Sequence, residues 1–120
     1  MLAYAAWEVH RRSPDEKFLR EIYPKMQMFY KFLIDKRDPR DHHLIGIINP
    51  DESGEDNSPR FDKPMHVPVT VSFASHYLER LKLVKANRVC DFDAEICMSK
   101  TFWVKDVPFN TILIKNLQVL

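Results

Sequence analysis

The chain has 120 residues, enough for one domain with a modest hydrophobic core. Its 18 Lys and Arg nearly balance its 17 Asp and Glu, and a net charge of +1 gives no electrostatic reason to expect nucleic acid or a membrane surface as partner. No apolar run approaches the roughly 20 residues of a membrane span, and the N-terminus lacks a signal-peptide pattern, so we expect a cytoplasmic protein.

Two helices are predicted first, over residues 1–12 and 15–37. Ser13 is a fitting N-cap for the second helix, with Pro14 in its first turn and Glu16 completing a capping box. Pro24 has no N–H to donate, so the second helix should kink or break near it. Apolar residues recur at helical spacing through both segments, namely Leu2, Ala5, Ala6, Val9, Phe18, Leu19, Ile22, Met26, Phe29, Tyr30 and Leu33.

An irregular segment is predicted over 38–67, and its centre is a dense polar run that we call the acidic loop (residues 52–62). The loop holds four carboxylates, one guanidinium, one amide and two hydroxyls. Such a run is ordinarily a solvated loop. However, Gly54 allows positive φ just before a carboxylate, and Pro59 favours an extended Ser58. The sequence is therefore also consistent with a tight turn that aims Asp56 at a site. The preceding apolar run, 44–48, fits either a strand or a buried approach to the loop.

Two further helices are predicted over 70–89 and 106–120, with an irregular connection at 91–100. Asp106 is placed to cap the last helix, and Pro108 suits its first turn. Cys90 and Cys97 have the wrong spacing for a Cys-x-x-Cys metal site, so we interpret them as two buried or reduced thiols. Three leucines of the last helix have few partners in so short a chain, and we expect an unusually large exposed apolar patch around Leu113, Leu117 and Leu120.

The acidic loop, Glu52-Ser53-Gly54-x-Asp56-Asn57-Ser58-Pro59-Arg60-x-Asp62, resembles the signature of α-glycoside hydrolases with an (α/α)6 barrel. These are the mannosylglycerate hydrolase-like and processing α-glucosidase-like enzymes, with trehalases as more distant relatives. The later run Phe102–Asn110 resembles a Phe-x-Val-x-Asp-x-x-Phe-Asn pattern of the same family. The resemblance implies an all-α fold, a partial (α/α)6 toroid. Twelve barrel helices do not fit in 120 residues, so residues 1–120 are expected to be a partial domain whose partner is the remainder of the barrel.

The resemblance also implies hydrolysis of an α-linked glycoside with inversion, with Asp56 as the general acid and no metal or cofactor. Our candidate substrate contacts are Glu52, Gly54, Asn57, Arg60 and Trp7, with Trp103 as a further aromatic that could stack on a sugar or belong to the core. The substrate would be an oligosaccharide or a small glycoside. An approach that is His-Pro-Trp in the family is Asn49-Pro50-Asp51 here, which removes one stacking aromatic.

General-acid chemistry requires that Asp56 be protonated near neutral pH. Glu52 and Glu55 would raise its pKa if they face it, and Arg60 would lower that pKa if the two side chains pair. The family's general base is a glutamate far toward the C-terminus. Nothing in this sequence matches its position, so we assign no base and expect the isolated chain to be inactive.

Two other function classes remain open: a non-catalytic helical carbohydrate-binding module, and a helical interaction domain whose acidic loop is only a solvated turn. A calcium-binding EF-hand is excluded because, counted from Asp51, glycine falls at the fourth position and not the sixth. Adjacent His42 and His43 are typical of an exposed loop more than of a zinc site.

Overall fold

A computed structural model describes residues 2–67 and 73–120. It contains helices α1 (Leu2–Arg12), α2 (Glu16–Arg37), α3 (Phe73–Val89), α4 (Ala94–Cys97) and α5 (Val107–Val119), with short 3-10 helices η1 (Pro50–Ser53) and η2 (Pro59–Phe61). Across the described residues, the one β contact is an antiparallel bridge between Ile47 and Val104. The all-α prediction is therefore confirmed. The predicted start of the third helix, residue 70, lies outside the described residues.

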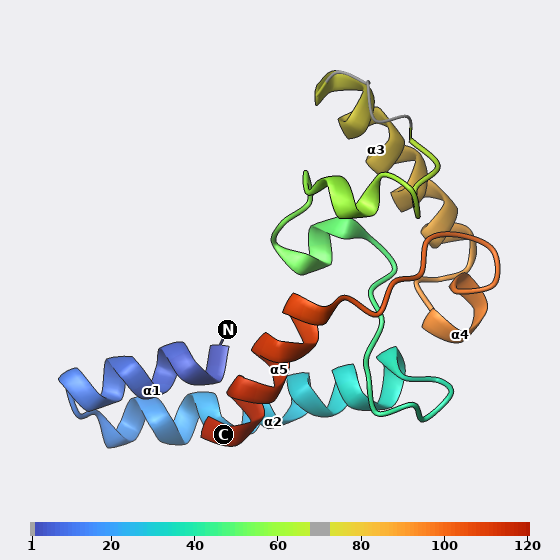
Figure 1. The fold of residues 1–120 in the computed structure, drawn as a ribbon. Helices are drawn as coiled ribbons and strands as arrows, with labels where there is room; N and C mark the ends of the chain where they lie inside the picture. The colour runs from blue at the N-terminus through green and yellow to red at the C-terminus, as the bar shows by residue number, and fades with distance from the viewer. Residues whose placement is uncertain (1, 68–72) are drawn as a thin grey trace.

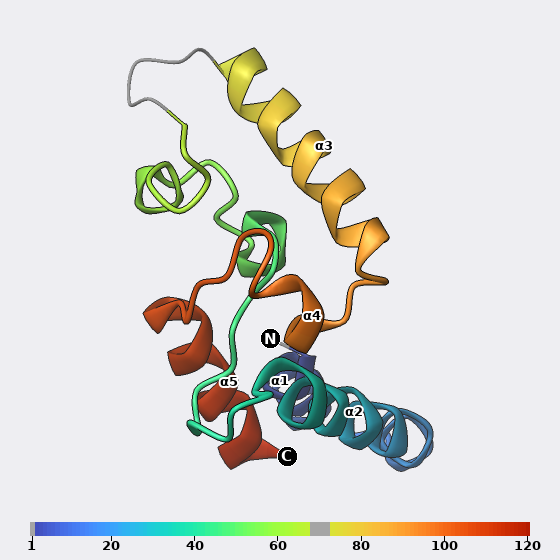
Figure 2. The same cartoon turned by 90° about the vertical axis from the view of Figure 1, so that its right-hand side faces the viewer.

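The helices form two parts with the acidic loop between them (Figures 1 and 2). Helix α1 packs against α2 and α5 at one end of the molecule, α3 extends toward the other end, and α4 lies below the C-terminal end of α3, where it contacts α2. None of the helices in the described ranges is both long and apolar enough to span a membrane.

Three small clusters of buried side chains hold this arrangement together. The first joins α1, α2 and α5 with Ile45, and the other two fix Ile47, Ile48 and the acidic loop against the C-terminal half. Apart from the exposed Leu44, the run 44–48 is therefore a buried approach to the loop with a single bridge, not a strand. The buried members are Ala3, Ala6, Met26, Tyr30, Leu33, Ile45 and Leu113 in the first cluster, Ile48, Cys90, Ala94 and Cys97 in the second, and Ile47, Phe61 and Phe102 in the third.

The prediction for the start of the second helix was wrong, and the helix does not break near Pro24. The N-cap is Asp15, whose side chain accepts a hydrogen bond from the backbone N–H of Phe18 at 3.0 Å. The N–H of Ser13 donates to the carbonyl of Val9, so Ser13 belongs to the end of α1. Pro24 lies inside a continuous α2 because apolar residues on both sides of it, the partly buried Phe18 and Ile22 before it and the buried Met26 after it, pack against the first cluster, and this packing outweighs the lost backbone hydrogen bond.

The connection after α3 also differs from its prediction. Ala94–Cys97 forms a helical turn, because the side chain of Asp93 caps it by accepting from the N–H of Ile96. This turn brings Cys97 back to Cys90 with their Cα atoms 5.5 Å apart, and the two are joined by a disulfide. Both cysteines are buried as predicted, but they are not free thiols.

Large apolar side chains remain exposed on several helices. Of the three leucines named from the sequence, Leu113 is buried, Leu117 is 36% exposed and Leu120 is partly buried. Helix α3 exposes Tyr77, Leu78, Leu81 and Val84. The apolar surface is therefore spread over α1, α2, α3 and α5 and is not concentrated on the last helix.

Candidate active site

Two tight turns shape the acidic loop. Asn49 caps η1 by accepting from the N–H of Asp51 at 2.9 Å, and Gly54 ends η1 with φ of +74°. An L-residue with a side chain is strained at that φ, which explains the glycine. Ser58 is extended (φ −70°, ψ 131°) and η2 begins at Pro59, as the proline predicts. The tight turn before Asp56 that the sequence made possible is present.

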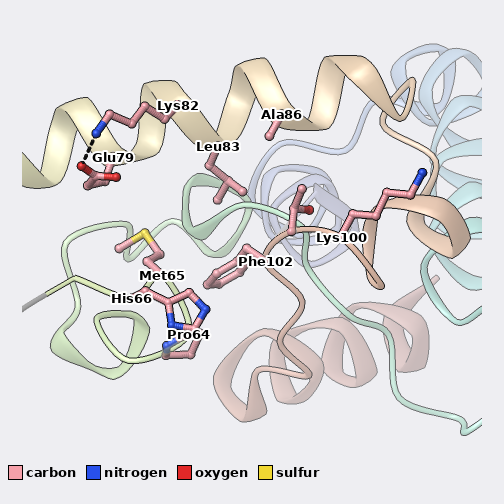
Figure 3. A pocket seen from close by; sticks show the side chains of 10 residues that line it. Pro64, Met65, His66, Glu79, Lys82, Leu83, Ala86, Lys100 and Phe102 are labelled. Atoms are coloured by element: carbon pink, nitrogen blue, oxygen red, sulfur yellow. Dashed lines mark hydrogen bonds and ion pairs between the residues drawn. The ribbon is translucent and has the colours of Figure 1, made fainter.

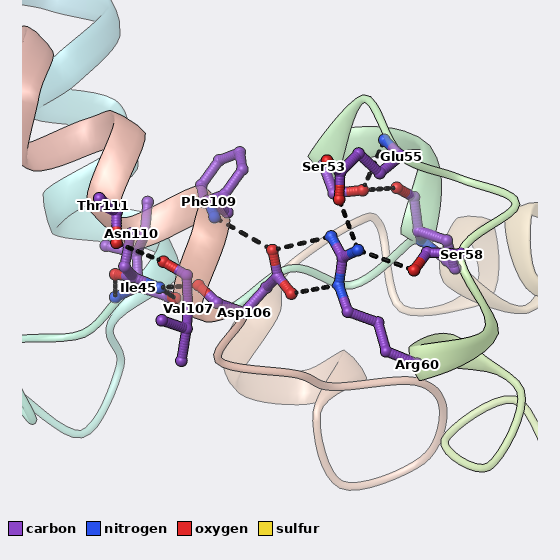
Figure 4. A network of polar contacts seen from close by, with 11 residues as sticks. Ile45, Ser53, Glu55, Ser58, Arg60, Asp106, Val107, Phe109, Asn110 and Thr111 are labelled. Carbon is purple, nitrogen blue, oxygen red and sulfur yellow. Dashed lines mark hydrogen bonds and ion pairs between the residues drawn. The ribbon is translucent and has the colours of Figure 1, made fainter.

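Arg60 joins the acidic loop to the start of α5 (Figure 4). Its Nε donates to Oδ1 of Asp106 at 2.8 Å and its Nη2 to Oδ2 at 3.3 Å. The remaining Nη1 contacts Ser58 and Glu55. Asp106 also caps α5 by accepting from the N–H of Phe109 at 3.0 Å. The contacts with Asp106 and Glu55 raise the pKa of Arg60 above its usual value. The candidate substrate contact Arg60 is thus engaged by the protein itself.

We expect Arg60→Gln to lower the free energy of unfolding by about 1.5–3 kcal/mol, the usual range for hydrogen bonds to charged groups. The carboxylate of Asp106 is nearly buried, with 3% of its side chain exposed, and would lose its cationic partner. Urea unfolding of the chain measures the loss. Arg20→Gln is the matched control because Arg20 makes only a surface pair with Glu16, with 82% of its side chain exposed, and should cost under about 0.5 kcal/mol. Equal losses in the two variants would rule out this role for Arg60.

Glu52 joins the beginning of the loop to α2. Its Oε1 accepts from Nη2 of Arg37 at 2.7 Å and its Oε2 from the N–H of Ile48 at 3.2 Å. Burial raises the pKa of Glu52 above its usual value, although Arg37 opposes the shift. Glu52 also borders a cavity of about 270 Å³ between α2 and α5, whose other walls are Phe29, Phe32, Leu33, Arg37, Gly46 and Phe109. Both oxygens of Glu52 are therefore occupied by groups other than Asp56.

Asp56, the candidate general acid, is held by Arg80 of α3. Nη1 of Arg80 donates to Oδ2 of Asp56 and also to Oδ1 of Asp51, the latter at 2.8 Å. The hydrogen bond from Arg80 lowers the pKa of Asp56 below its usual value. The sequence suggested Glu52, Glu55 or Arg60 as the groups that tune Asp56, and none of them pairs with it. Arg80 was missed because a single arginine on a predicted helix gives no signal of what it faces across the loop.

The remaining candidates lie in different places. Gly54 and Asn57 are exposed on the loop. Trp7 borders a cavity of about 160 Å³ formed by α1, α2 and the end of α5, which contains no residue of the acidic loop. Trp103 covers Gly46 so closely that a Cβ there would collide with its ring, so Trp103 is part of the packing.

A further cavity, of about 260 Å³, lies between α3 and the segments around residues 64–66 and 100–102 (Figure 3). Leu83, Ala86, Met65 and Phe102 form its apolar part, and His66, Lys82 and Lys100 lie at its edge. None of the candidate acid or substrate residues borders it.

Among the described residues, the side-chain oxygens and nitrogen of Asp38, Asp41 and His43 approach one another within 4.8 Å, as metal ligands do. Asp38 already accepts from the N–H of His42 at 3.0 Å and pairs with Lys105 at 3.5 Å. Asp41 and His43 are exposed. These contacts account for the cluster without an ion.

Comparisons with known proteins show which family this chain is similar to. The family model for the mannosylglycerate hydrolase MGH1-like glycoside hydrolase domain matches residues 1–120. The mannosylglycerate hydrolase of Thermus thermophilus is 38% identical over 128 residues, covering 88% of this chain and 31% of the relative. Mannosylglycerate hydrolase MGH1 of Selaginella moellendorffii is 35% identical over 116 residues, covering 80% and 24%.

Solved structures agree with the sequence comparison. A GH63 mannosylglycerate hydrolase from Thermus thermophilus in complex with glucose superposes with a TM-score of 0.84 at 28% identity, covering 98% of this chain and 34% of that one. The same enzyme with Tris and D-glycerate gives the same values. The chain therefore spans between about a quarter and a third of the length of these relatives.

Proposed function

Because this chain belongs to the mannosylglycerate hydrolase MGH1-like glycoside hydrolase family, we propose that it supplies the general-acid segment of an enzyme that hydrolyses an α-linked glycoside with inversion. The proposed acid is Asp56, which would protonate the oxygen of the leaving group. The proposed substrate is a small glycoside of the mannosylglycerate type. Two relatives are mannosylglycerate hydrolases, and solved structures of one such enzyme contain glucose or D-glycerate.

The observation that carries this proposal is the way the acidic loop presents Asp56. Glu52 fixes one side of the loop to Arg37 of α2, and Arg60 fixes the other to Asp106. Between these two ion pairs, 36% of the Asp56 side chain is exposed. A general acid needs a fixed position and access to the substrate oxygen, and the fixed loop and the partly exposed Asp56 support the proposal on these two counts.

The proposed partner is the remainder of the barrel, with residues 1–120 as a partial domain of it. The relatives are about three to four times as long as this chain, and the family resemblance locates the general base in a later part of the barrel. The exposed apolar side chains of α3 (Tyr77, Leu78, Leu81 and Val84) support the proposal, because a helix of the barrel would cover such a face. The cytoplasmic location remains a prediction. The Cys90–Cys97 disulfide argues against it, because disulfides are rare in cytosolic proteins.

One observation favours a second candidate, a non-catalytic carbohydrate-binding module. Asp56 is paired with Arg80, and an ionised carboxylate cannot donate a proton. In a protein that uses the loop for binding alone, Asp56 could stay ionised and paired with Arg80 throughout.

The experiment that tests the first proposal follows mannosylglycerate hydrolysis by proton NMR, with the natural protein that contains these residues. Inversion at an α-linked mannoside should release the β-anomer of mannose first. Initial release of the α-anomer would contradict inversion. If no hydrolysis occurs, titration of the 120-residue chain with mannosylglycerate separates the alternatives: amide shifts in the acidic loop indicate a binding module, and unshifted amides leave only the interaction domain.

A further inference from the structure

Arg80 occupies an unusual position between two carboxylates. Its Nη1 donates to both Asp51 and Asp56, and 9% of its side chain is exposed, against 52% for Asp51 and 36% for Asp56. The Nε of Arg80 is buried and has no hydrogen-bond partner among the described residues. Among the described residues, the ionic partners of the guanidinium are therefore these two carboxylates, both of which are much more exposed than it is, and its Cζ lies 5.9 Å from the ring centroid of Tyr77.

We propose that Arg80 is a positioning residue that holds Asp56 against α3, and that Asp51 keeps the guanidinium paired whenever Asp56 takes up a proton. This inference rests on the proposed role of Asp56 as general acid. When Asp56 becomes neutral, its attraction to Arg80 is largely lost. A nearly buried arginine without a partner would be costly, and Asp51 removes that cost because it already contacts the same nitrogen.

The other charged groups of the loop and several of those on α3 are engaged elsewhere, and Lys85 and Arg88 of α3 are exposed. Glu52 pairs with Arg37 and Glu55 with Arg60. On α3, His76 faces Asp62 at 3.3 Å and Glu79 pairs with Lys82. Arg80 from α3 and Asp51 from η1 are thus the charged groups whose contacts bear on Asp56.

Asp51 is also a feature of this particular sequence. In the family pattern that the loop resembles, the residue at this position is typically a tryptophan, which cannot accept a hydrogen bond from a guanidinium. Here a carboxylate shares Arg80 with Asp56 and adds a negative charge beside it. Both effects favour the protonated form of Asp56, so Asp51 partly offsets the influence of Arg80 on the acid.

Two substitutions should therefore shift the titration of Asp56 in opposite directions. Arg80 lowers the pKa of Asp56, so Arg80→Gln should move the titration midpoint upward. Asp51→Asn should move it downward, because Arg80 would then have Asp56 as its sole ionic acceptor and a like charge would be gone. Arg80→Lys keeps the positive charge and should return the midpoint part of the way toward that of the unaltered chain. A residue that only stabilised the fold would not produce shifts of opposite sign.

The test is a pH titration of the 120-residue chain, followed by the carbon-13 shift of the Asp56 carboxyl. Arg88→Gln, an exposed arginine on the same helix, and Asp91→Asn, an exposed aspartate, are the matched charge controls and should leave the midpoint unchanged. An unchanged or raised midpoint in Asp51→Asn would overturn the proposal. This variant alters an exposed side chain, so it remains informative even if Arg80→Gln fails to fold.

The titration does not involve turnover, so its result is separable from the proposed function. Shifts as expected, together with turnover that does not require Asp56, would end the proposed function but leave the Arg80–Asp51 pairing in place. If the titration midpoint of Asp56 does not shift in the variants, but turnover does require Asp56, only the proposed role of Arg80 and Asp51 is ruled out.

Discussion

Asp56→Asn is expected to lower turnover of mannosylglycerate by about 10²–10⁴-fold in the natural protein, the usual contribution of general acid–base assistance. An amide has nearly the size of the carboxyl group but cannot deliver a proton to the leaving oxygen. The fold should survive the change because Arg80 keeps Asp51 as a partner and the loop keeps its ion pairs at Glu52 and Arg60. Circular dichroism and saccharide binding should therefore stay close to those of the unaltered protein.

The loss should be smaller with activated substrates such as aryl glycosides or glycosyl fluorides, since their leaving groups need little protonation. Glu55→Gln is the matched control, because Glu55 is an exposed neighbour of Asp56. Among the described residues, its carboxylate pairs with Arg60. This substitution should reduce turnover far less than Asp56→Asn does. Equal losses at the two positions, or normal turnover by Asp56→Asn on the natural substrate, would mean that the proton comes from another group.

Phe61→Ala is expected to lower the free energy of unfolding of the chain by about 3–5 kcal/mol. Phe61 is fully buried, and its ring meets that of Phe102 edge to face with centroids 5.8 Å apart. It lies in the acidic loop, next to Arg60, and joins the loop to the cluster around Ile47. Because small domains are stable by only about 5–15 kcal/mol in total, this loss should also lower the melting temperature by roughly 10–20 °C.

Phe32→Ala is the matched control for Phe61→Ala, because it removes the same side chain from a site that is 49% exposed on α2. Its cost should be under about 1 kcal/mol. Thermal unfolding monitored by circular dichroism gives both values. A Phe61→Ala variant as stable as Phe32→Ala would show that the loop is not held by its buried aromatic contacts.

Local chemistry was sufficient to predict the four longer helices and the shape of the loop turns, but not the short helix α4. Asp106 caps α5, Gly54 takes a positive φ, and Pro59 starts η2 from an extended Ser58, and each effect depends on residues within a few positions. Local sequence signals were not sufficient at two places in α2. Asp15 displaced Ser13 as the cap of α2, and packing on both sides of Pro24 kept that helix continuous.

The ion pairs that hold the candidate site were decided by the tertiary structure alone. Arg37 meets Glu52 across 15 positions, Arg80 meets Asp56 across 24, and Arg60 meets Asp106 across 46. A charged side chain reaches only a few ångströms, so its partner depends on where whole helices come to lie, and helix placement follows from burial of apolar faces that carry no information about charge. The sequence by itself therefore determined which residue is the candidate acid, since its family pattern is local. Only the fold determined that Arg80, which also contacts Asp51, and not the neighbouring glutamates, pairs with that acid.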